Sequence, residues 1–415
     1  MPLLPALLLL APQMLAAPTE RPNVLLIISD DQGYGDFGFM GHPEIRTPHL
    51  DALADESLVF PRGYVPTALC RASLATLVSG LYPHQHKITG NDPPAGTDRA
   101  RMLAHIEALD TLPELLGAAG YRSLQTGKWW EGNCECGGFT EGMTHGNPAR
   151  GGRHGDEGLT IGRQTLGPAL DFIDSCVDGE TPFFLWYAPF LPHRPHNPPE
   201  RIHATYARPD VPRPIAQYRA MCTWLDETCG TLLEHLEARG IAERTLVVFV
   251  TDNGWIQRPD AAGYAPRSKR TPYEGGVRTP ILLRWPGAIE PARVDVPVSS
   301  VDIPTTIAAA CGLDVPARWP GVDLRADVAE RGPIFGAAFT HDVVALDDPV
   351  QSLTTRWVLR DPFKLLVHAD PERPTELYDV RADPGEERPL AAPDTERALR
   401  VELDRWWSAE GSRER

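Results

Sequence analysis

Residues 23–29 have the sequence NVLLIIS and lead directly into the acidic pair Asp30-Asp31. Residues 245–251, with the sequence TLVVFVT, repeat this design and lead into Asp252-Asn253. Residues 182–187, PFFLWY, form a third apolar run, which precedes a loop rich in proline and histidine. Because these runs are hydrophobic at successive rather than alternate positions, they predict strands that are buried on both faces. Such strands are typical of a parallel sheet sandwiched between helices.

Segments that we predict to be helical alternate with these strands along the chain. They are residues 47–57, 72–79, 111–119, 164–174 and 216–239. Alternation of strands and helices predicts an α/β fold, in which ligands bind at the carboxyl ends of the parallel strands. Both acidic pairs are expected at such ends.

The pattern changes after about residue 332. Shorter apolar segments at residues 356–359, 363–367 and 376–380 predict a small antiparallel sheet, and residues 394–407 predict an amphipathic helix. We therefore expect a main domain over residues 20–331, built on a large, mostly parallel sheet with helices on both sides. A C-terminal subdomain over residues 332–415 would hold the small antiparallel sheet and the last helix.

Composition and charge exclude some classes of function. The formal net charge of −16 argues against nucleic acid as a partner, because duplex binding requires basic surface patches. The first 19 residues carry no charged side chain and contain four consecutive leucines at 7–10. This stretch is shorter than a membrane span, so residues 1–17 are predicted to be a signal peptide. The sequence thus predicts a secreted or periplasmic protein without a stable membrane anchor.

Seven cysteines are an odd number for a secreted protein. Setting Cys70 aside leaves six, which permits up to three disulfides. Cys222 and Cys229 are not expected to pair, since seven residues of helix separate them by roughly 10 Å. Cys134 and Cys136 are too close and too isolated for a metal site, so they are predicted to form a disulfide or to remain idle thiols.

The two acidic pairs together offer three carboxylates and one amide oxygen. Hard oxygen ligands of this kind suit Ca²⁺ or Mg²⁺ rather than zinc. A single acidic pair after a strand could simply cap a helix or a turn. Two such pairs, each closing a buried strand, favour a metal site formed by Asp30, Asp31, Asp252 and Asn253.

Residues 66–78 contain the segment CRASL at positions 70–74, a cysteine followed by small residues at the start of a predicted helix. Its pattern resembles the C-x-P-S-R signature of type I, formylglycine-dependent sulfatases, which belong to the alkaline phosphatase-like superfamily. Further segments in the same order resemble other motifs of that family. They are TGKW at 126–129, LPHRPH at 191–196, YEGGVRTP at 273–280 with Lys269 ahead of it, RWPG at 284–287, and ELYD at 376–379 followed by DPGE at 383–386. The resemblance extends from residue 21 to about residue 383.

The resemblance implies a role for each candidate site residue. The metal ligands would hold one Ca²⁺, in preference to Mg²⁺, beside a formylglycine (3-oxoalanine) that a formylglycine-generating enzyme makes from Cys70. One hydroxyl of the hydrated aldehyde would attack sulfur, and the other would then expel sulfate. Lys128 and Lys269 would bind the sulfuryl oxygens, and His193 would act as general acid, with His196 facing the substrate or serving a structural role. The implied function is a sulfuric ester hydrolase that acts on sulfated small molecules or glycans.

Two positions depart from the family pattern at the site itself. Leu74 stands in place of the arginine that contacts the modified residue, and Trp130 stands in place of a histidine. An indole N–H can donate a hydrogen bond but cannot transfer a proton. Ala72 in place of the proline is a milder change.

Two other functions stay open on the sequence alone. One is a phosphoester hydrolase of the same superfamily, because sulfuryl and phosphoryl groups are nearly isosteric. The other is a catalytically silent protein that binds sulfated glycans through the same cationic pocket. Residues 132–163, rich in glycine, histidine and arginine, are the predicted specificity loop.

Overall fold

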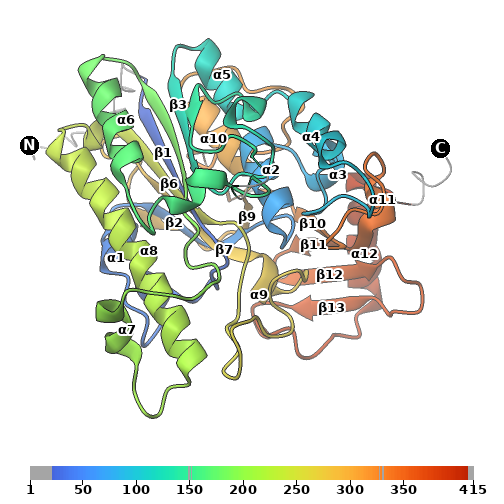
Figure 1. The fold of residues 1–415 in the computed structure, drawn as a ribbon. Helices are drawn as coiled ribbons and strands as arrows, with labels where there is room; N and C mark the ends of the chain where they lie inside the picture. Colours follow the sequence, from blue (N-terminus) through green and yellow to red (C-terminus); the bar gives the residue numbers. More distant parts are fainter. Residues whose placement is uncertain (1–20, 148–149, 151, 327, 330, 410–415) are drawn as a thin grey trace, which may run out of the picture.

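The computed structural model describes residues 21–147, 150, 152–326, 328–329 and 331–409 (Figure 1). The predicted signal peptide therefore lies outside the described residues. Within the described parts, no helix is both long enough and apolar enough to cross a bilayer.

A large sheet forms the centre of the molecule. Its strands run in the order β4 (Glu141–Gly142), β3 (Arg122–Gly127), β5 (Phe183–Ala188), β1 (Asn23–Ser29), β6 (Thr245–Thr251), β7 (Arg278–Arg284), β2 (Leu58–Tyr64) and β8 (Ala292–Arg293), with β9 (Val298–Ser299) also paired to β2. All neighbouring strands are parallel except β7, which is antiparallel to both β6 and β2. The predicted mostly parallel sheet is confirmed.

The two central strands show why continuous hydrophobicity predicts burial on both faces. In β1, Val24 and Leu26 belong to one hydrophobic cluster, while Leu25 and Ile27 belong to another. Because successive side chains of a strand point to opposite faces, each face of the sheet receives its own apolar layer. Strand β6 is divided between the same two clusters.

Helices cover both faces of this sheet. One cluster joins it to α1 (Pro48–Asp55), α6 (Gly167–Asp178) and α8 (Arg213–Ala238). The other joins it to α2 (Cys70–Ser79), α4 (Arg99–Glu107), α5 (Leu112–Ala118) and α10 (Asp302–Ala310). Short helices occupy connections: α3 (Pro83–His86), α7 (Glu200–Tyr206), α9 (Glu274–Val277) and α11 (Pro349–Ser352), with 3₁₀ turns at Gly38–Met40, Cys134–Gly137, Asp156–Thr160 and Ala242–Arg244. The five predicted helices of the main domain correspond to α1, α2, α5, α6 and α8.

A second, four-stranded antiparallel sheet follows at the C-terminal end, beside the main sheet in Figure 1. It consists of β10 (Ile334–Phe339), β11 (Leu353–Arg360), β12 (Phe363–His368) and β13 (Glu376–Asp379). The last helix, α12 (Pro393–Trp406), packs on it through Leu399 and Leu403. The predicted small sheet and closing helix are thus present.

A buried ion cluster connects the small sheet to the main one. The Lys364 ammonium on β12 lies 3.1 Å from a Glu274 carboxylate oxygen and 3.0 Å from one of Glu386. Glu274 begins α9, and its backbone N–H also binds the Glu386 carboxylate. Since removal of one partner of a buried ion pair is strongly destabilising, this cluster fixes the segment that carries Lys269 just upstream.

Candidate active site

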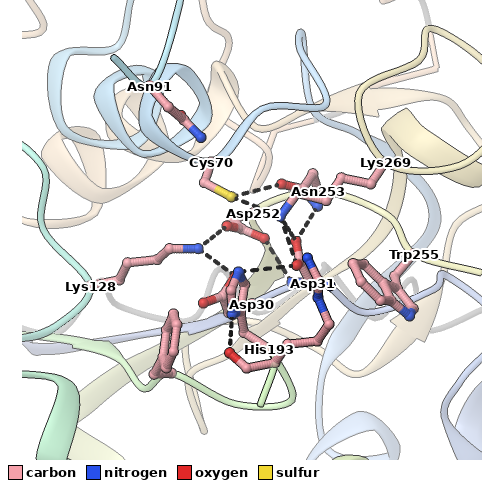
Figure 2. Close-up of polar contacts among 12 residues, drawn as sticks. Asp30, Asp31, Cys70, Asn91, Lys128, His193, Asp252, Asn253, Trp255 and Lys269 are labelled. Carbon is pink, nitrogen blue, oxygen red and sulfur yellow. Dashed lines mark hydrogen bonds and ion pairs between the residues drawn. The ribbon is translucent and has the colours of Figure 1, made fainter. Parts of the chain in front are cut away.

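The two acidic pairs meet at the carboxyl ends of the adjacent strands β1 and β6. The backbone N–H of Asp31 donates to Oδ1 of Asp252 at 3.0 Å, and the Asn253 amide donates to Oδ1 of Asp31 at 2.7 Å. Asp31 has a left-handed backbone with φ of 63°, which turns the chain sharply after β1. All four residues, Asp30 included, are at most 2% exposed. The structure therefore brings together the four predicted metal ligands (Figure 2).

Two lysines neutralise part of this negative charge. Nζ of Lys128, which follows β3, lies 2.6 Å from Oδ1 of Asp30 and 3.5 Å from Oδ2 of Asp252. Nζ of Lys269 lies 2.7 Å from Oδ2 of Asp31. Burial alone would lower the pKa of each lysine, but the carboxylates raise it above its ordinary value. Three carboxylates thus face two ammonium groups.

The remaining negative charge fits a cation. Oδ2 of Asp30 is buried and has no hydrogen-bond partner among the described residues. Burial raises the pKa of Asp30 well above its ordinary value despite the contact with Lys128. Ligand atoms of Asp30, Asp31, Asp252 and Cys70 lie within 4.8 Å of one another. An oxygen-rich cluster with an orphaned carboxylate oxygen is suited to a hard divalent cation.

Cys70 begins α2 and points at this cluster. Its Sγ lies 3.2 Å from Nζ of Lys269 and 3.4 Å from Oδ1 of Asn253. The side chain is 2% exposed, and burial raises the pKa of the thiol to about 12. The unmodified thiol therefore stays protonated at neutral pH, which makes it a poor nucleophile.

His193 reaches the cluster from the loop that follows β5. The backbone N–H of Asp30 donates to the carbonyl of Leu191 at 2.9 Å, which holds this loop against the end of β1. Nδ1 of His193 donates to the Arg194 carbonyl at 2.6 Å, so Nε2 is the nitrogen that faces Oδ2 of Asp31, 3.4 Å away. Burial lowers the pKa of His193, while the Asp31 carboxylate opposes that shift.

His196, the other histidine of this loop, lies elsewhere. It is 8% exposed and packs against the rings of Tyr218 and Trp255, at centroid distances of 5.5 and 6.1 Å. Of its two predicted roles, the structure supports the structural one.

A cavity of about 240 Å³ opens above Cys70. Among the described residues, it is lined by Cys70, Asn91, Lys128, Trp130, Arg153, His154, His193, Arg194, Tyr264, Lys269, Arg270 and His341. Four of these were predicted as catalytic residues, and Trp130 was singled out as a departure. The other seven had no predicted role, although Arg153 and His154 fall within the predicted specificity loop. No carboxylate side chain belongs to this described lining.

The structure also explains the unusual residues around Cys70. Arg71 points away from the cavity and forms a bidentate pair with Glu131, with two N–O distances of 2.6 Å. It therefore does not take the place of the arginine that the family pattern has at position 74. Leu74 is 3% exposed and belongs to the hydrophobic cluster on the α2 face of the sheet.

Leu74→Arg is expected to lower the free energy of unfolding by several kcal/mol, because it buries a guanidinium without a partner. Leu74→Met, which conserves volume and polarity, should cost less than about 1.5 kcal/mol. Urea unfolding of both variants measures the difference. A stable Leu74→Arg protein that hydrolyses substrate much faster than the wild type would show instead that this site lacks a functional arginine.

All seven cysteines, each within the described part of the chain, are free thiols. The alternative of a disulfide between Cys134 and Cys136 is therefore wrong, and these residues are unpaired. Cys222 and Cys229 are buried separately along α8, as the helical spacing predicts.

Comparisons with known proteins agree with this geometry. A family model for sulfatases matches residues 22–313, and one for the C-terminal part of N-sulphoglucosamine sulphohydrolase matches residues 264–408. Arylsulfatase A from Homo sapiens is 31% identical over 368 residues, covering 77% of this chain and 70% of that protein. N-acetylgalactosamine-6-sulfatase from Rattus norvegicus is 31% identical over 358 residues, covering 76% of this chain and 66% of that protein.

The fold is also found among solved structures. The crystal structure of Ps i-CgsB in complex with k-i-k-neocarrahexaose superposes with a TM-score of 0.77, at 24% sequence identity and with 94% of each chain covered. The family match spans every strand of the large sheet, both acidic pairs, Cys70 and both site lysines. The chain belongs to the sulfatase family of sulfuric ester hydrolases.

Proposed function

We propose that this sulfatase releases inorganic sulfate from sulfated carbohydrate, using a formylglycine made from Cys70 and one Ca²⁺. The observation that carries the proposal is the position of Cys70. Its Sγ lies at the floor of the cavity, between Nζ of Lys269 and the amide oxygen of Asn253, beside three buried carboxylates.

The cation site is assigned to Asp30, Asp31, Asp252 and Asn253. A bound Ca²⁺ supplies positive charge that favours an ionised nucleophile and balances the sulfuryl oxygens. The orphaned Oδ2 of Asp30 supports this assignment, because a buried carboxylate oxygen without a donor is costly unless a cation binds it. Carboxylate and amide oxygens with flexible coordination suit Ca²⁺ better than the strict octahedron of Mg²⁺.

Lys128 and Lys269 each contact the carboxylate cluster and also bind the substrate. Each ammonium contacts a carboxylate of the cluster and also lines the cavity. As fixed cations already held in place, Lys128 and Lys269 bind the sulfuryl oxygens without reorganising during the reaction. In its protonated form, which the Asp31 carboxylate favours, His193 presents an Nε2–H to the same cavity and transfers that proton to the leaving oxygen.

Position 70 provides the nucleophile. The hydrated aldehyde supplies two hydroxyl groups on one carbon, one to attack sulfur and the other to expel sulfate as the aldehyde re-forms. The modification needs a formylglycine-generating enzyme as a partner during maturation. A secreted or periplasmic location fits a glycan substrate.

Carbohydrate is favoured as the substrate class by the relatives. One is an N-acetylgalactosamine-6-sulfatase, and a structural neighbour was crystallised with neocarrahexaose.

Mass spectrometry tests the proposal directly. The full chain, co-expressed with a formylglycine-generating enzyme, should yield a peptide with an aldehyde in place of the Cys70 thiol. The same preparation should release sulfate from 4-nitrophenyl sulfate faster than phosphate from 4-nitrophenyl phosphate. An unmodified thiol together with no turnover would favour the catalytically silent glycan-binding function, and faster phosphate release would favour the phosphoester hydrolase.

A further inference from the structure

The mouth of the cavity carries more positive charge than one sulfate group requires. Beyond Lys128 and Lys269, the described lining includes three arginines: Arg153, Arg194 and Arg270. All three are exposed, whereas the lysines are at most 8% exposed. These three arginines, which we term the rim arginines, stand out on a chain with a net charge of −16.

Arg153 is held in place by the surrounding residues. Its Nε lies 2.6 Å from Oδ1 of Asp92, and its guanidinium carbon lies 4.8 Å from the centroid of the Trp130 ring. Arg99 binds the same Asp92 oxygen at 3.1 Å and the backbone carbonyl of Arg153 at 3.1 Å. Two guanidiniums thus share one carboxylate.

Two further acids lie near this group: Glu131, whose carboxylate is bound by Arg71, and Asp342. The Asp342 carboxylate forms an ion pair with His341 at 2.6 Å and is 64% exposed, so water screens it. Arg153 itself is 43% exposed and remains able to bind an additional anion at the cavity mouth.

The other two rim arginines form no ion pair with a carboxylate of the described residues. Arg194 donates to the backbone carbonyl of Ala262 at 3.0 Å, and its guanidinium carbon lies 5.8 Å from the centroid of the Trp255 ring. The guanidinium of Arg270 makes no hydrogen bond or ion pair within the described chain. Its backbone N–H donates to the carbonyl of Ala68 at 2.9 Å, which places it next to the helix that carries Cys70.

Trp130 contributes a second observation, an unpaired buried donor on a residue that lines the cavity. The residue is 3% exposed and lines the cavity, yet its indole N–H has no acceptor among the described residues. Buried donors are normally paired, so this one is available to a ligand. The residue that replaces the family's histidine therefore both supports Arg153 and offers a donor to the cavity.

We propose that the substrate carries a second anionic group, a sulfate or a carboxylate, on its leaving-group side, and that the rim arginines bind it. This inference rests on the proposed function, since the scissile sulfate occupies the position between Lys128 and Lys269. Guanidinium groups are suited to this task because they bind oxyanions with paired hydrogen bonds. The substrate class is a polyanionic saccharide, such as a disulfated sugar or a sulfated unit beside a uronic acid.

The first experiment measures binding without turnover. Full-length protein with unmodified Cys70 is titrated calorimetrically, in the presence of Ca²⁺, with benzenesulfonate and with benzene-1,3-disulfonate. We expect the disulfonate to bind about tenfold more tightly, in keeping with one added charge-assisted contact. Arg270→Gln and Arg153→Gln should each reduce this ratio, and the double variant, in which only Arg194 of the rim arginines remains, should reduce it further.

Arg201→Gln serves as the matched control. Arg201 lies on α7, away from the cavity, and forms an exposed ion pair with Glu227. Its replacement removes the same charge and should keep the wild-type ratio. The Arg270 guanidinium makes no hydrogen bond or ion pair with the described residues, so Arg270→Gln should not disturb the fold. A lower binding ratio in this variant would therefore reflect the lost charge and not misfolding. Equal binding of the two sulfonates by the wild type, absence of binding by either, or an unchanged ratio in the double variant would overturn the inference.

The second experiment separates this inference from the proposed function. The modified enzyme is assayed on 3-carboxy-4-nitrophenyl sulfate and on the neutral 3-carbamoyl analogue. We expect a higher kcat/KM for the carboxylate substrate than for the carbamoyl substrate, mainly because its KM is lower. The ratio of the two kcat/KM values should be smaller in Arg153→Gln and Arg270→Gln, and smaller at high salt. Hydrolysis of both without preference would overturn the rim assignment alone. Hydrolysis of neither, with the sulfonate preference intact, would count against the sulfatase proposal and leave the anion site supported.

Discussion

Replacement of Cys70 by serine is expected to lower steady-state sulfate release by at least about a thousandfold, the scale of losing a nucleophile in other hydrolases. The serine hydroxyl fits the same position at the start of α2, near Lys269 and Asn253. A single hydroxyl can attack sulfur but leaves no second hydroxyl to expel sulfate. The variant should therefore stop after one turnover, and intact-mass spectrometry should show the mass of one added SO₃ group.

Cys136→Ser is the control for this experiment. Cys136 is a half-buried free thiol outside the cavity, so its replacement should leave both turnover and the mass unchanged. Wild-type turnover by Cys70→Ser would mean that the two-hydroxyl chemistry is wrong here. The phosphoester hydrolase, which usually has a serine or threonine nucleophile, would then become the better assignment.

The fold could be predicted best for strands that are buried on both faces, because their sequences are continuously hydrophobic. Strands β1, β5 and β6 could be identified in this way, whereas β3 could not, because its sequence is RSLQTG. Apart from the half-buried Arg122, its polar side chains are nevertheless buried, and they form hydrogen bonds with neighbouring backbone groups. The Thr126 hydroxyl donates to the carbonyl of Trp186 at 2.9 Å, and Gln125 donates to the carbonyl of Gly127 at 3.1 Å. Strand β2 was missed as well, since it contains Pro61 and Gly63, which are unfavourable in strands.

The site shows a similar division. Residues that follow a strand end or belong to a recognisable motif could be predicted, and the structure brings all eight of them together. The rim of the cavity could be predicted only in part: Arg153 falls within the predicted specificity loop, but the contacts that bring it to the cavity depend on long-range packing. A bridge between Asp92 and Asp342 brings His341 to the cavity, and Arg99 joins Asp92 to Arg153. Such contacts leave no periodic signal in a single sequence.

Asp252→Ala is expected to abolish Ca²⁺ binding and activity while leaving the fold intact. Mutation of a residue that only hydrogen-bonds to a metal ligand typically lowers metal affinity roughly 10–100-fold. Loss of a direct ligand such as Asp252 should lower the affinity for Ca²⁺ by more than that. The stability of the metal-free protein should not suffer. Without Asp252, the carboxylates of Asp30 and Asp31 face the ammonium groups of Lys128 and Lys269 in equal number.

Thermal unfolding with and without Ca²⁺ measures this effect independently of turnover. At about 100 times its Kd, Ca²⁺ should stabilise the wild type by about 2.7 kcal/mol, and EGTA should remove both that increment and the activity. Neither Asp252→Ala nor Asp31→Ala should respond to Ca²⁺. Asp394→Ala, which removes an exposed carboxylate on α12, should respond as the wild type does. Full turnover by either site variant in EGTA would contradict the metal assignment, because catalysis would then need neither that carboxylate nor a cation.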